Sequence, residues 1–238
     1  MLNTLSADFR IIFNRDPAAR NWIEVLFCYP GVQALIFYRL AHWFYCLKVP
    51  FIPRLISYVI RFWTGIEIHP GAKIGKGVFI DHGMGVVIGE TVIVGDYAML
   101  YQGVTLGGTG KETGKRHPTL GQNVVVGAGA KVLGNIQIGD RVCIGAGSVV
   151  LRNIPANSTV VGIPGRIVRH QGKPVNLNNE NLPDPEAEVI RALFDRIQFL
   201  EQEIERLKTQ NGLVCAAHTQ KSQATTSIIE NFLDGAGI

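Results

Sequence analysis

A repeat of aliphatic residues every six positions runs through the middle of this chain and constrains its fold more than any other feature. Thirteen such positions, in three runs, are all aliphatic, and eight of them are followed directly by glycine. A period of six matches neither the turn of an α-helix nor the alternation of a flat strand. It is typical of a coil of short strands and corners. The positions are Ile68, Ile74, Ile80, Ile88, Val94, Leu100, Leu106, Leu120, Val126, Val132, Ile138, Ile144 and Val150.

Three sides of six residues make a triangular coil of 18 residues, with one aliphatic side chain per side pointing inward. Stacked coils pair as parallel strands do, about 4.8 Å apart. Of the 27 glycines, 22 lie between Gly65 and Gly165, where they tolerate the unusual dihedral angles of corners. The alternative reading of the repeat is a flat antiparallel sheet with regular turns.

Two interruptions of the repeat predict loops, because an insertion must leave the stack. Two extra residues lie between Ile80 and Ile88. A longer insertion, Gly108 to Thr119, reads GTGKETGKRHPT and is polar and basic. A protruding segment of this composition indicates a ligand lid.

The flanking segments have other patterns. Residues 1–65 have apolar residues at helical spacing and predict an α-helical N-terminal domain, followed by the β-helix over 66–168. Residues 169–185 are rich in Asn and Pro and predict a linker. Residues 186–210 carry a heptad and predict a coiled-coil helix, and 211–238 predict a flexible tail. Ile190, Ile197 and Ile204 take one core position of the heptad, and Leu193, Leu200 and Leu207 take the other.

Composition excludes several classes of protein. A net charge of +4 without an aromatic-basic cluster argues against nucleic acid as a partner. Four scattered cysteines without a CxxC pair argue against a zinc or dithiol site and favour reduced thiols in the cytoplasm. No uncharged apolar run reaches 18 residues, so a membrane span is disfavoured, with peripheral membrane contact as the alternative.

The repeat resembles that of the left-handed parallel β-helix acyltransferases, and further motifs narrow the resemblance to the serine acetyltransferase family. It spans residues 15–168, most of the part expected to fold. The motifs are RDPA at 15–18, GVQALIFYRLAHWFY at 31–45, EIHPGAKIGKGVFIDH at 67–82, VTLGGTGK at 104–111, TGKRHP at 113–118, GAGAKVLGNIQIG at 127–139 and VVGIPGRIV at 160–168.

The resemblance implies a mainly β protein with α-helices: a left-handed parallel β-helix that follows the helical N-terminal domain. It implies a serine O-acetyltransferase, which transfers acetyl from acetyl-CoA to the hydroxyl of L-serine in cysteine biosynthesis. Acetyl-CoA would be a co-substrate, with no permanently bound cofactor and no metal. We expect direct attack by bound serine, because Cys143, the thiol on a coil, is better explained as a packed side chain.

The resemblance assigns His82 as the general base, a role that suits an imidazole near neutral pH. Glu67, one coil earlier, would orient it, although the family usually has aspartate at this position. Asp16 and Asp81 would bind serine near its amino and hydroxyl groups. Arg116 would pair with the serine carboxylate, and His117 beside it would help to hold the substrate. Asp16 has a second reading as the start of a helix, with Pro17 in its first turn.

Acetyl-CoA is expected in a groove between two neighbouring β-helices, where small residues let its pantetheine approach the backbone. The amides of Gly107 and Gly108 are candidate donors to the oxyanion. The candidate cofactor-binding residues are Gly107, Gly108, Thr109, Ala128 and Ala146. Lys111 and Lys131 are candidate partners of the CoA phosphates.

The family forms trimers, so we expect a homotrimer, with a dimer of trimers left open; the heptad fits either a trimeric bundle or a bridge between trimers. The last residues, DGAGI, resemble the family's C-terminal tail, which implies that Ile238 binds O-acetylserine sulfhydrylase. L-Cysteine is the expected feedback inhibitor at the serine site.

Three other functions would account for part of the sequence. A sugar O-acetyltransferase would explain the repeat but not RDPA or the 31–45 motif. A zinc site of His69, His82 and His117 has spacings of 13 and 35 residues, which do not match the carbonic-anhydrase-like family on this fold. A non-catalytic regulatory subunit of cysteine synthase would not need His82, Asp81 and Arg116 together.

Overall fold

The computed structural model describes residues 2–110, 113–174 and 185–210. The chain divides into two units, Met1–Val175 and Asn176–Ile238, and each is described by itself. The predicted tail and Ile238, Lys111, and residues 175–184 of the predicted linker lie outside the described residues.

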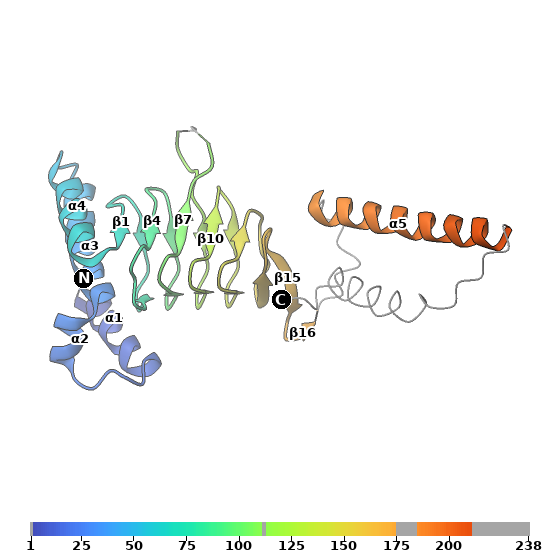
Figure 1. Ribbon diagram of the computed structural model, residues 1–238. Coiled ribbons are helices and arrows are strands. Elements are labelled where there is room, and N and C mark those ends of the chain that lie inside the picture. Colours follow the sequence, from blue (N-terminus) through green and yellow to red (C-terminus); the bar gives the residue numbers. More distant parts are fainter. Residues whose placement is uncertain (1, 111–112, 175–184, 211–238) are drawn as a thin grey trace. The chain divides into compact units, whose positions relative to one another are not determined.

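The predicted triangular coil is confirmed as three sheets whose coil strands pair in parallel and recur in a fixed order along the chain (Figure 1). Sheet A contains β1 (Glu67–Ile68), β4 (Val87–Ile88), β7 (Thr105–Gly107), β10 (Lys131–Leu133) and β13 (Val149–Val150). Sheet B contains β2 (Lys73–Ile74), β5 (Ile93–Val94), β8 (Thr119–Leu120) and β11 (Gln137–Ile138). Sheet C contains β3 (Phe79–Ile80), β6 (Met99–Leu100), β9 (Val125–Val126), β12 (Cys143–Ile144), β14 (Ser158–Val161), β15 (Arg166–His170) and β16 (Lys173–Pro174).

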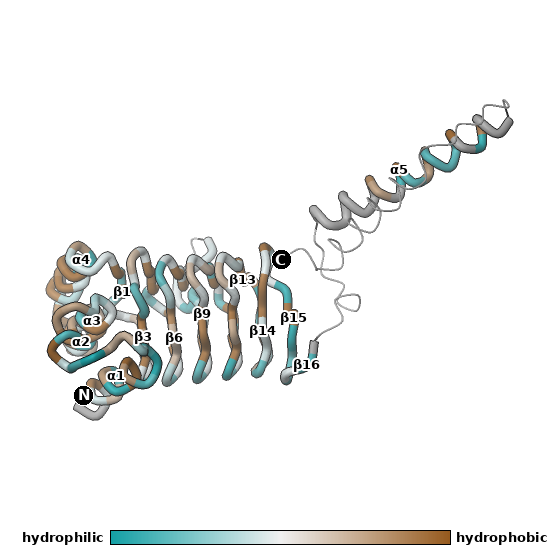
Figure 2. The backbone as a smooth tube through the Cα atoms, turned by 60° about the horizontal axis from the view of Figure 1, so that its bottom comes forward, coloured by the Kyte–Doolittle hydropathy of each residue, from teal (hydrophilic) through white to brown (hydrophobic). Residues whose placement is uncertain are grey.

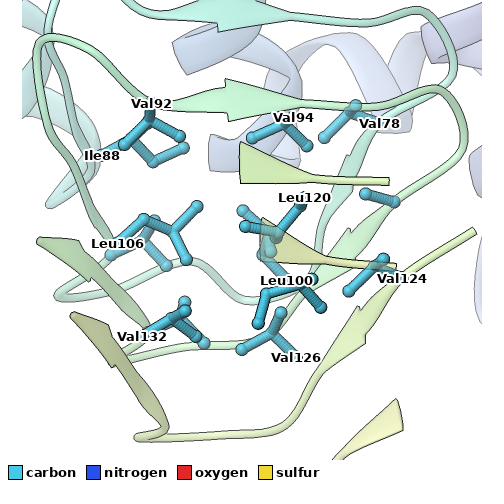
Figure 3. Close-up of a cluster of buried hydrophobic side chains, with 14 of the residues drawn as sticks. Val78, Ile88, Val92, Val94, Leu100, Leu106, Leu120, Val124, Val126 and Val132 are labelled. Atoms are coloured by element: carbon cyan, nitrogen blue, oxygen red, sulfur yellow. The ribbon is translucent and has the colours of Figure 1, made fainter. Parts of the chain in front are cut away.

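The repeat sets both the register and the core. Ile88 pairs with Ile68 on one side and with Leu106 on the other, so aliphatic residues stack directly above one another. All thirteen repeat positions lie in or against one buried cluster, and only Ile74 among them is partly exposed. Figure 3 shows Leu100, Leu106 and their neighbours pointing into the interior of the coil. Each buried Leu, Ile or Val stabilises the folded state by roughly 1.5–3 kcal/mol.

Glycines hold the corners between sheets C and A. Gly103 and Gly129 both have φ of +71°, a left-handed conformation that costs glycine little. Gly103 N–H donates to the carbonyl of Met84 at 2.8 Å, and Gly129 N–H donates to that of Gln102 at 2.8 Å. Each corner therefore bonds to the corner of the previous coil.

Four helices cover the start of the stack (Figure 1 and Figure 2): α1 (Leu2–Arg15), α2 (Trp22–Cys28), α3 (Pro30–Cys46) and α4 (Ile52–Thr64). A buried network joins them to the coil. Arg39 pairs with Asp8 at 2.8 Å and donates to the carbonyls of Ile74 and Gly75, while Gly77 N–H donates to Asp8. Apolar residues at helical spacing along α3 divide by face. Ala34, Leu35, Tyr38 and Ala41 are buried, whereas Leu40 and Phe44 are half-buried and Tyr45 is exposed.

The end of the first unit differs from the predicted boundary. Residues 169–174, expected as the start of a linker, belong to the antiparallel strands β15 and β16. The physical reason is a tight turn: Gln171 and Gly172 have φ of +51° and +76°, which folds the chain back on itself. Gln171 N–H also donates to the carbonyl of Asn157 at 2.8 Å, which anchors the turn.

The second unit contains one long helix, α5 (Pro185–Gln210). Its described apolar seam residues are solvent-exposed in the single chain. No single helix in the described part is both long and apolar enough to cross a membrane, and α2 with α3 would pass that test only as a pair bent by 74°.

Candidate functional site

The predicted site residues lie on two corners of the triangular coil. The C–A corner joins a strand of sheet C to the next strand of sheet A, and it carries Asp81 and His82 between β3 and β4. The A–B corner joins sheet A to sheet B. It carries Arg116 and His117 between β7 and β8. Figure 1 shows the insertion of the A–B corner as a loop that protrudes between β7 and β10.

His82 lies in the two-residue interruption of the repeat and projects from the C–A corner. Its φ is +57°, a left-handed conformation that is uncommon outside glycine and often marks functional positions. The side chain is 76% exposed, and its Nε2 atom lies 4.0 Å from Oδ1 of Asp81. The local strain presents an accessible imidazole beside a carboxylate.

Asp16 lies near enough to this corner to feel the charge of His82, and it is bonded to Tyr29, which the sequence alone did not single out. The Tyr29 hydroxyl donates to Asp16 Oδ2 at 2.6 Å, and Ala18 N–H donates to Oδ1 at 2.8 Å. The Tyr29 hydrogen bond is the main cause that lowers the pKa of Asp16, and the charge of His82 lowers it further. The same bond raises the pKa of Tyr29 to about 12, with a smaller contribution from the charge of Asp81. Asp16 is therefore held as a carboxylate near His82 and Asp81.

Glu67, the predicted orienter of His82, is the first residue of β1, which follows α4, and it pairs with Val87 of β4, the strand that comes after His82. Its carboxylate pairs with Arg61 of α4 at 3.0 Å. Within the described residues no hydrogen bond joins it to His82. The pairing of Glu67 with His82 stays a prediction.

The A–B corner holds Arg116 in a defined orientation. Its Nη2 atom donates to Oε2 of Glu90 at 2.7 Å, and this bond is the main cause that lowers the pKa of Glu90. Lys115 turns away from the site, because its ammonium donates to the carbonyls of Thr91, His117 and Pro118. Arg116 keeps further guanidinium donors for a ligand.

His117 is buried against this corner, and its hydrogen bonds fix the tautomer. Thr91 N–H donates to Nδ1 at 3.3 Å, so Nδ1 is an acceptor and the ring proton lies on Nε2. The Thr91 hydroxyl also contacts Nδ1 at 2.9 Å and accepts from the backbone of Arg116. Burial lowers the pKa of His117, and the charges of Arg116 and Lys115 lower it further. Thr91 was not identified from the sequence, because a threonine within the repeat is not distinctive.

The remaining predicted residues divide between the same two corners. Gly107 ends β7, and Gly108 and Thr109 follow it on the A–B corner, where Gly108 lies close to the His117 ring. Ala128 and Ala146 lie on successive C–A corners above His82. Gly108, Thr109 and Ala146 are exposed. Lys131, a candidate for CoA phosphates, donates to the carbonyl of Gly103 at 2.6 Å.

The zinc alternative finds no support in this geometry. His69 and His117 lie on the A–B corner, whereas His82 lies on the C–A corner. Among the described residues, no group of three or more His, Cys, Asp or Glu is placed to hold a metal ion.

Comparison with known proteins places this arrangement in context. A family described as bacterial transferase hexapeptide (six repeats) matches residues 117–152. A serine acetyltransferase from Synechocystis sp. is 71% identical over 213 residues, which cover 89% of this chain and 86% of that protein. A serine acetyltransferase from Synechococcus elongatus is 62% identical over 244 residues, with 100% of both chains covered.

Solved structures are similar as well. The crystal structure of serine acetyltransferase from Brucella abortus in complex with coenzyme A has 42% identity and a TM-score of 0.70, over 72% of this chain and 69% of that one. A serine acetyltransferase in complex with cysteine has 40% identity and a TM-score of 0.69, over 71% and 70% of the two chains.

Proposed function

The chain belongs to the serine acetyltransferase family, and from that membership we propose how its own residues carry out the reaction. It is an acyltransferase built on a left-handed parallel β-helix, as the sequence motifs predict, and it acetylates the hydroxyl of L-serine in cysteine biosynthesis. Acetyl-CoA is the co-substrate. The proposals below concern the residues, the assembly and the partners.

One observation carries the proposal: the chemistry-bearing residues of one chain form two half-sites on two corners of the coil. Asp16, Asp81 and His82 gather on the C–A corner, and Arg116 and His117 gather on the A–B corner. A substrate as small as serine cannot reach both corners of one prism. A complete site therefore requires the C–A corner of one copy to face the A–B corner of another, which closes as a homotrimer.

On the C–A corner, His82 acts as the general base. The hydroxyl proton of serine passes to the imidazole as the oxygen attacks the thioester carbon. The tetrahedral intermediate collapses, the carbon–sulfur bond breaks, and the departing thiolate takes the proton back. Asp81 and Asp16 bind the serine ammonium and hydroxyl groups, and the Tyr29 hydroxyl at 2.6 Å holds the Asp16 carboxylate in place for this task.

Glu67 stabilises the imidazolium that forms on His82, in the manner of other base and carboxylate pairs. Arg61 holds the Glu67 carboxylate at 3.0 Å and keeps it at the corner. Because glutamate is one methylene longer than aspartate, its carboxylate can contact both Arg61 and His82.

On the A–B corner of the neighbouring copy, Arg116 binds the serine carboxylate. Its bond to Glu90 leaves the guanidinium oriented, which reduces the entropy lost on binding. His117 is neutral with its proton on Nε2, so it donates a hydrogen bond to the substrate without adding charge. The amides of Gly107 and Gly108 stabilise the oxyanion, because Gly108 lies beside that ring.

Acetyl-CoA lies in the groove between the two copies. Gly107, Gly108 and Thr109 on one corner and Ala128 and Ala146 on the other would face each other across it. Small side chains let the pantetheine arm approach the backbone on both walls. This distribution of candidates over the same two corners as the serine residues supports the shared groove.

The partners follow from the same site. L-Cysteine competes with serine, because it differs from serine by one atom. The tail ending in Ile238 binds O-acetylserine sulfhydrylase through a side chain and a free carboxylate.

We place the enzyme in the cytoplasm, since Cys28, Cys46 and Cys143 are free thiols. A dimer of trimers is the larger assembly to be tested.

The direct test measures release of CoA thiol from acetyl-CoA with L-serine as acceptor. Two control reactions contain a galactoside as acceptor or no acceptor. Turnover with L-serine that falls on addition of L-cysteine supports the proposal. Turnover with the galactoside alone would support a sugar acetyltransferase. Binding of the sulfhydrylase without any turnover would support a regulatory subunit.

A further inference from the structure

The helix α5 carries a seam of solvent-exposed apolar side chains. Leu193, Ile197, Leu200, Ile204 and Leu207 are 45–57% exposed and recur at alternating spacings of four and three. Burying one such side chain is favourable by roughly 1.5–3 kcal/mol, so this helix gains stability from a partner along its length. The pattern is that of the a and d positions of a coiled coil.

The flanks of the seam identify the partner. With isoleucine at a and leucine at d, Arg196 takes position g and Glu201 takes the following position e. In a parallel pair, position g of one helix faces the next e of the other. Arg196 therefore faces Glu201 of a second copy, and Glu201 faces Arg196 of that copy.

The next g and e positions along the helix also carry opposite charges, with the negative residue now at g and the positive residue at e. Glu203 takes position g, and Lys208 takes the following e. Glu203 also pairs with Arg206 of its own helix at 3.7 Å. An antiparallel pair sets e against e and g against g, which would place Glu201 opposite Lys208 and Arg196 opposite Glu203. The flanking charges therefore suit both directions, and the residues at a and d decide between them.

We propose that α5 pairs in parallel and in register with α5 of a second copy of this chain. Isoleucine at a with leucine at d favours two strands. The pairing does not depend on how many copies the β-helix brings together or on the proposed catalytic roles, because α5 belongs to a separate unit.

The test is a cysteine at the seam, read by disulfide formation between chains. The full chain is prepared with its four native cysteines replaced by serine, once with Leu200→Cys and once with Gln202→Cys. Gln202 lies at position f, on the opposite face, and it is exposed. The two variants carry the thiol only two residues apart on the same helix. A difference between their rates of disulfide formation therefore shows whether the seam faces a second copy.

Under mild oxidation we expect Leu200→Cys to form the two-chain product on the order of ten-fold faster than Gln202→Cys, because a disulfide needs its Cα atoms within about 7 Å. Glu201→Arg added to Leu200→Cys should slow the reaction, since Arg196 would then face an arginine. Adding Arg196→Glu as well should restore it.

Equal rates for Leu200→Cys and Gln202→Cys would overturn the proposal, since the seam would then not be shared between copies. A rate that ignores Glu201→Arg, or that Arg196→Glu does not restore, would overturn the parallel register.

Discussion

His82 and His117, the two histidines of the candidate site, lie on different corners of the same triangular coil. His82 follows a strand of sheet C, and His117 precedes a strand of sheet B. One is 76% exposed and the other is buried. The difference in environment suits two roles, because an accessible imidazole can exchange a proton and a buried neutral one can hold a substrate. In the proposed mechanism, one chain therefore presents two halves of a site.

Replacing the proposed base tests its role without disturbing the corner. Asparagine tolerates the left-handed conformation of His82, so His82→Asn keeps the backbone geometry. We expect turnover to fall by a factor on the order of 10²–10⁴, with little change in the KM for serine. The control is His170→Asn, because His170 contacts Ser158 on the closing hairpin, away from both corners. Full turnover of His82→Asn would rule out His82 as the base.

The hydroxyl of Tyr29 is expected to matter through Asp16. Tyr29→Phe removes the 2.6 Å bond that holds the Asp16 carboxylate in place, so the hold of that carboxylate on serine should weaken although it stays ionised. We expect the KM for serine to rise about ten-fold, from the loss of a hydrogen bond to a charged group. Tyr58→Phe, on an exposed tyrosine of α4, should leave the KM unchanged. A KM unaffected by Tyr29→Phe would show that Asp16 does not depend on Tyr29.

Titration of His117 should reveal its environment. Its pKa is lowered from the ordinary 6.5, so the neutral ring contributes stability that is complete above pH 6.5 and is lost as the pH falls through the folded value. Histidine NMR signals followed from pH 8 downward should place its midpoint below that of the urea-unfolded chain. Arg116→Gln should raise the midpoint by removing a nearby positive charge. A midpoint at or above the unfolded value would contradict the assigned burial.

The network at the start of the stack should be the most sensitive polar element of the fold. Arg39→Met leaves the buried Asp8 without its ion-pair partner, and burial already raises the pKa of that carboxyl. We expect the free energy of unfolding in urea to fall by about 3–5 kcal/mol. Lys76→Met removes an exposed pair with Asp96 at 3.9 Å and should cost less than about 1 kcal/mol. Equal losses from the two variants would contradict the structural role of Arg39.

The sequence predicted the coil well because its signal is local and periodic. The repeat positions point into the same interior, and only Ile74 is partly exposed, so Leu100 and Leu106 are buried for the same reason as Val126. The closing strands were harder to predict, since residues 169–174 lack the repeat and fold back through a tight turn at Gln171. The Asn- and Pro-rich residues that follow led to the prediction of a linker in place of the turn.

The site was predicted only in part, because its supporting residues come from distant segments. Tyr29 precedes Pro30 and reads as a helix boundary, and only the packing of α2 and α3 brings its hydroxyl to Asp16. Thr91 reads as an ordinary repeat residue, although it fixes the tautomer of His117 from 26 residues away. A strict six-residue repeat would show from the sequence which corner each residue occupies. His82, Arg116 and His117 lie in the two insertions, where that repeat is interrupted.

The central claim is that one active site takes its residues from two copies of the chain. Co-expression of His82→Asn and Arg116→Gln chains with different tags, followed by purification of mixed assemblies, tests it directly. Each variant alone should have little kcat/KM for serine. In a mixed trimer one of the three interfaces contains both intact halves, so we predict recovery of about a third of the wild-type value per site. Activity in the mixture no higher than in the separate variants would contradict a shared site.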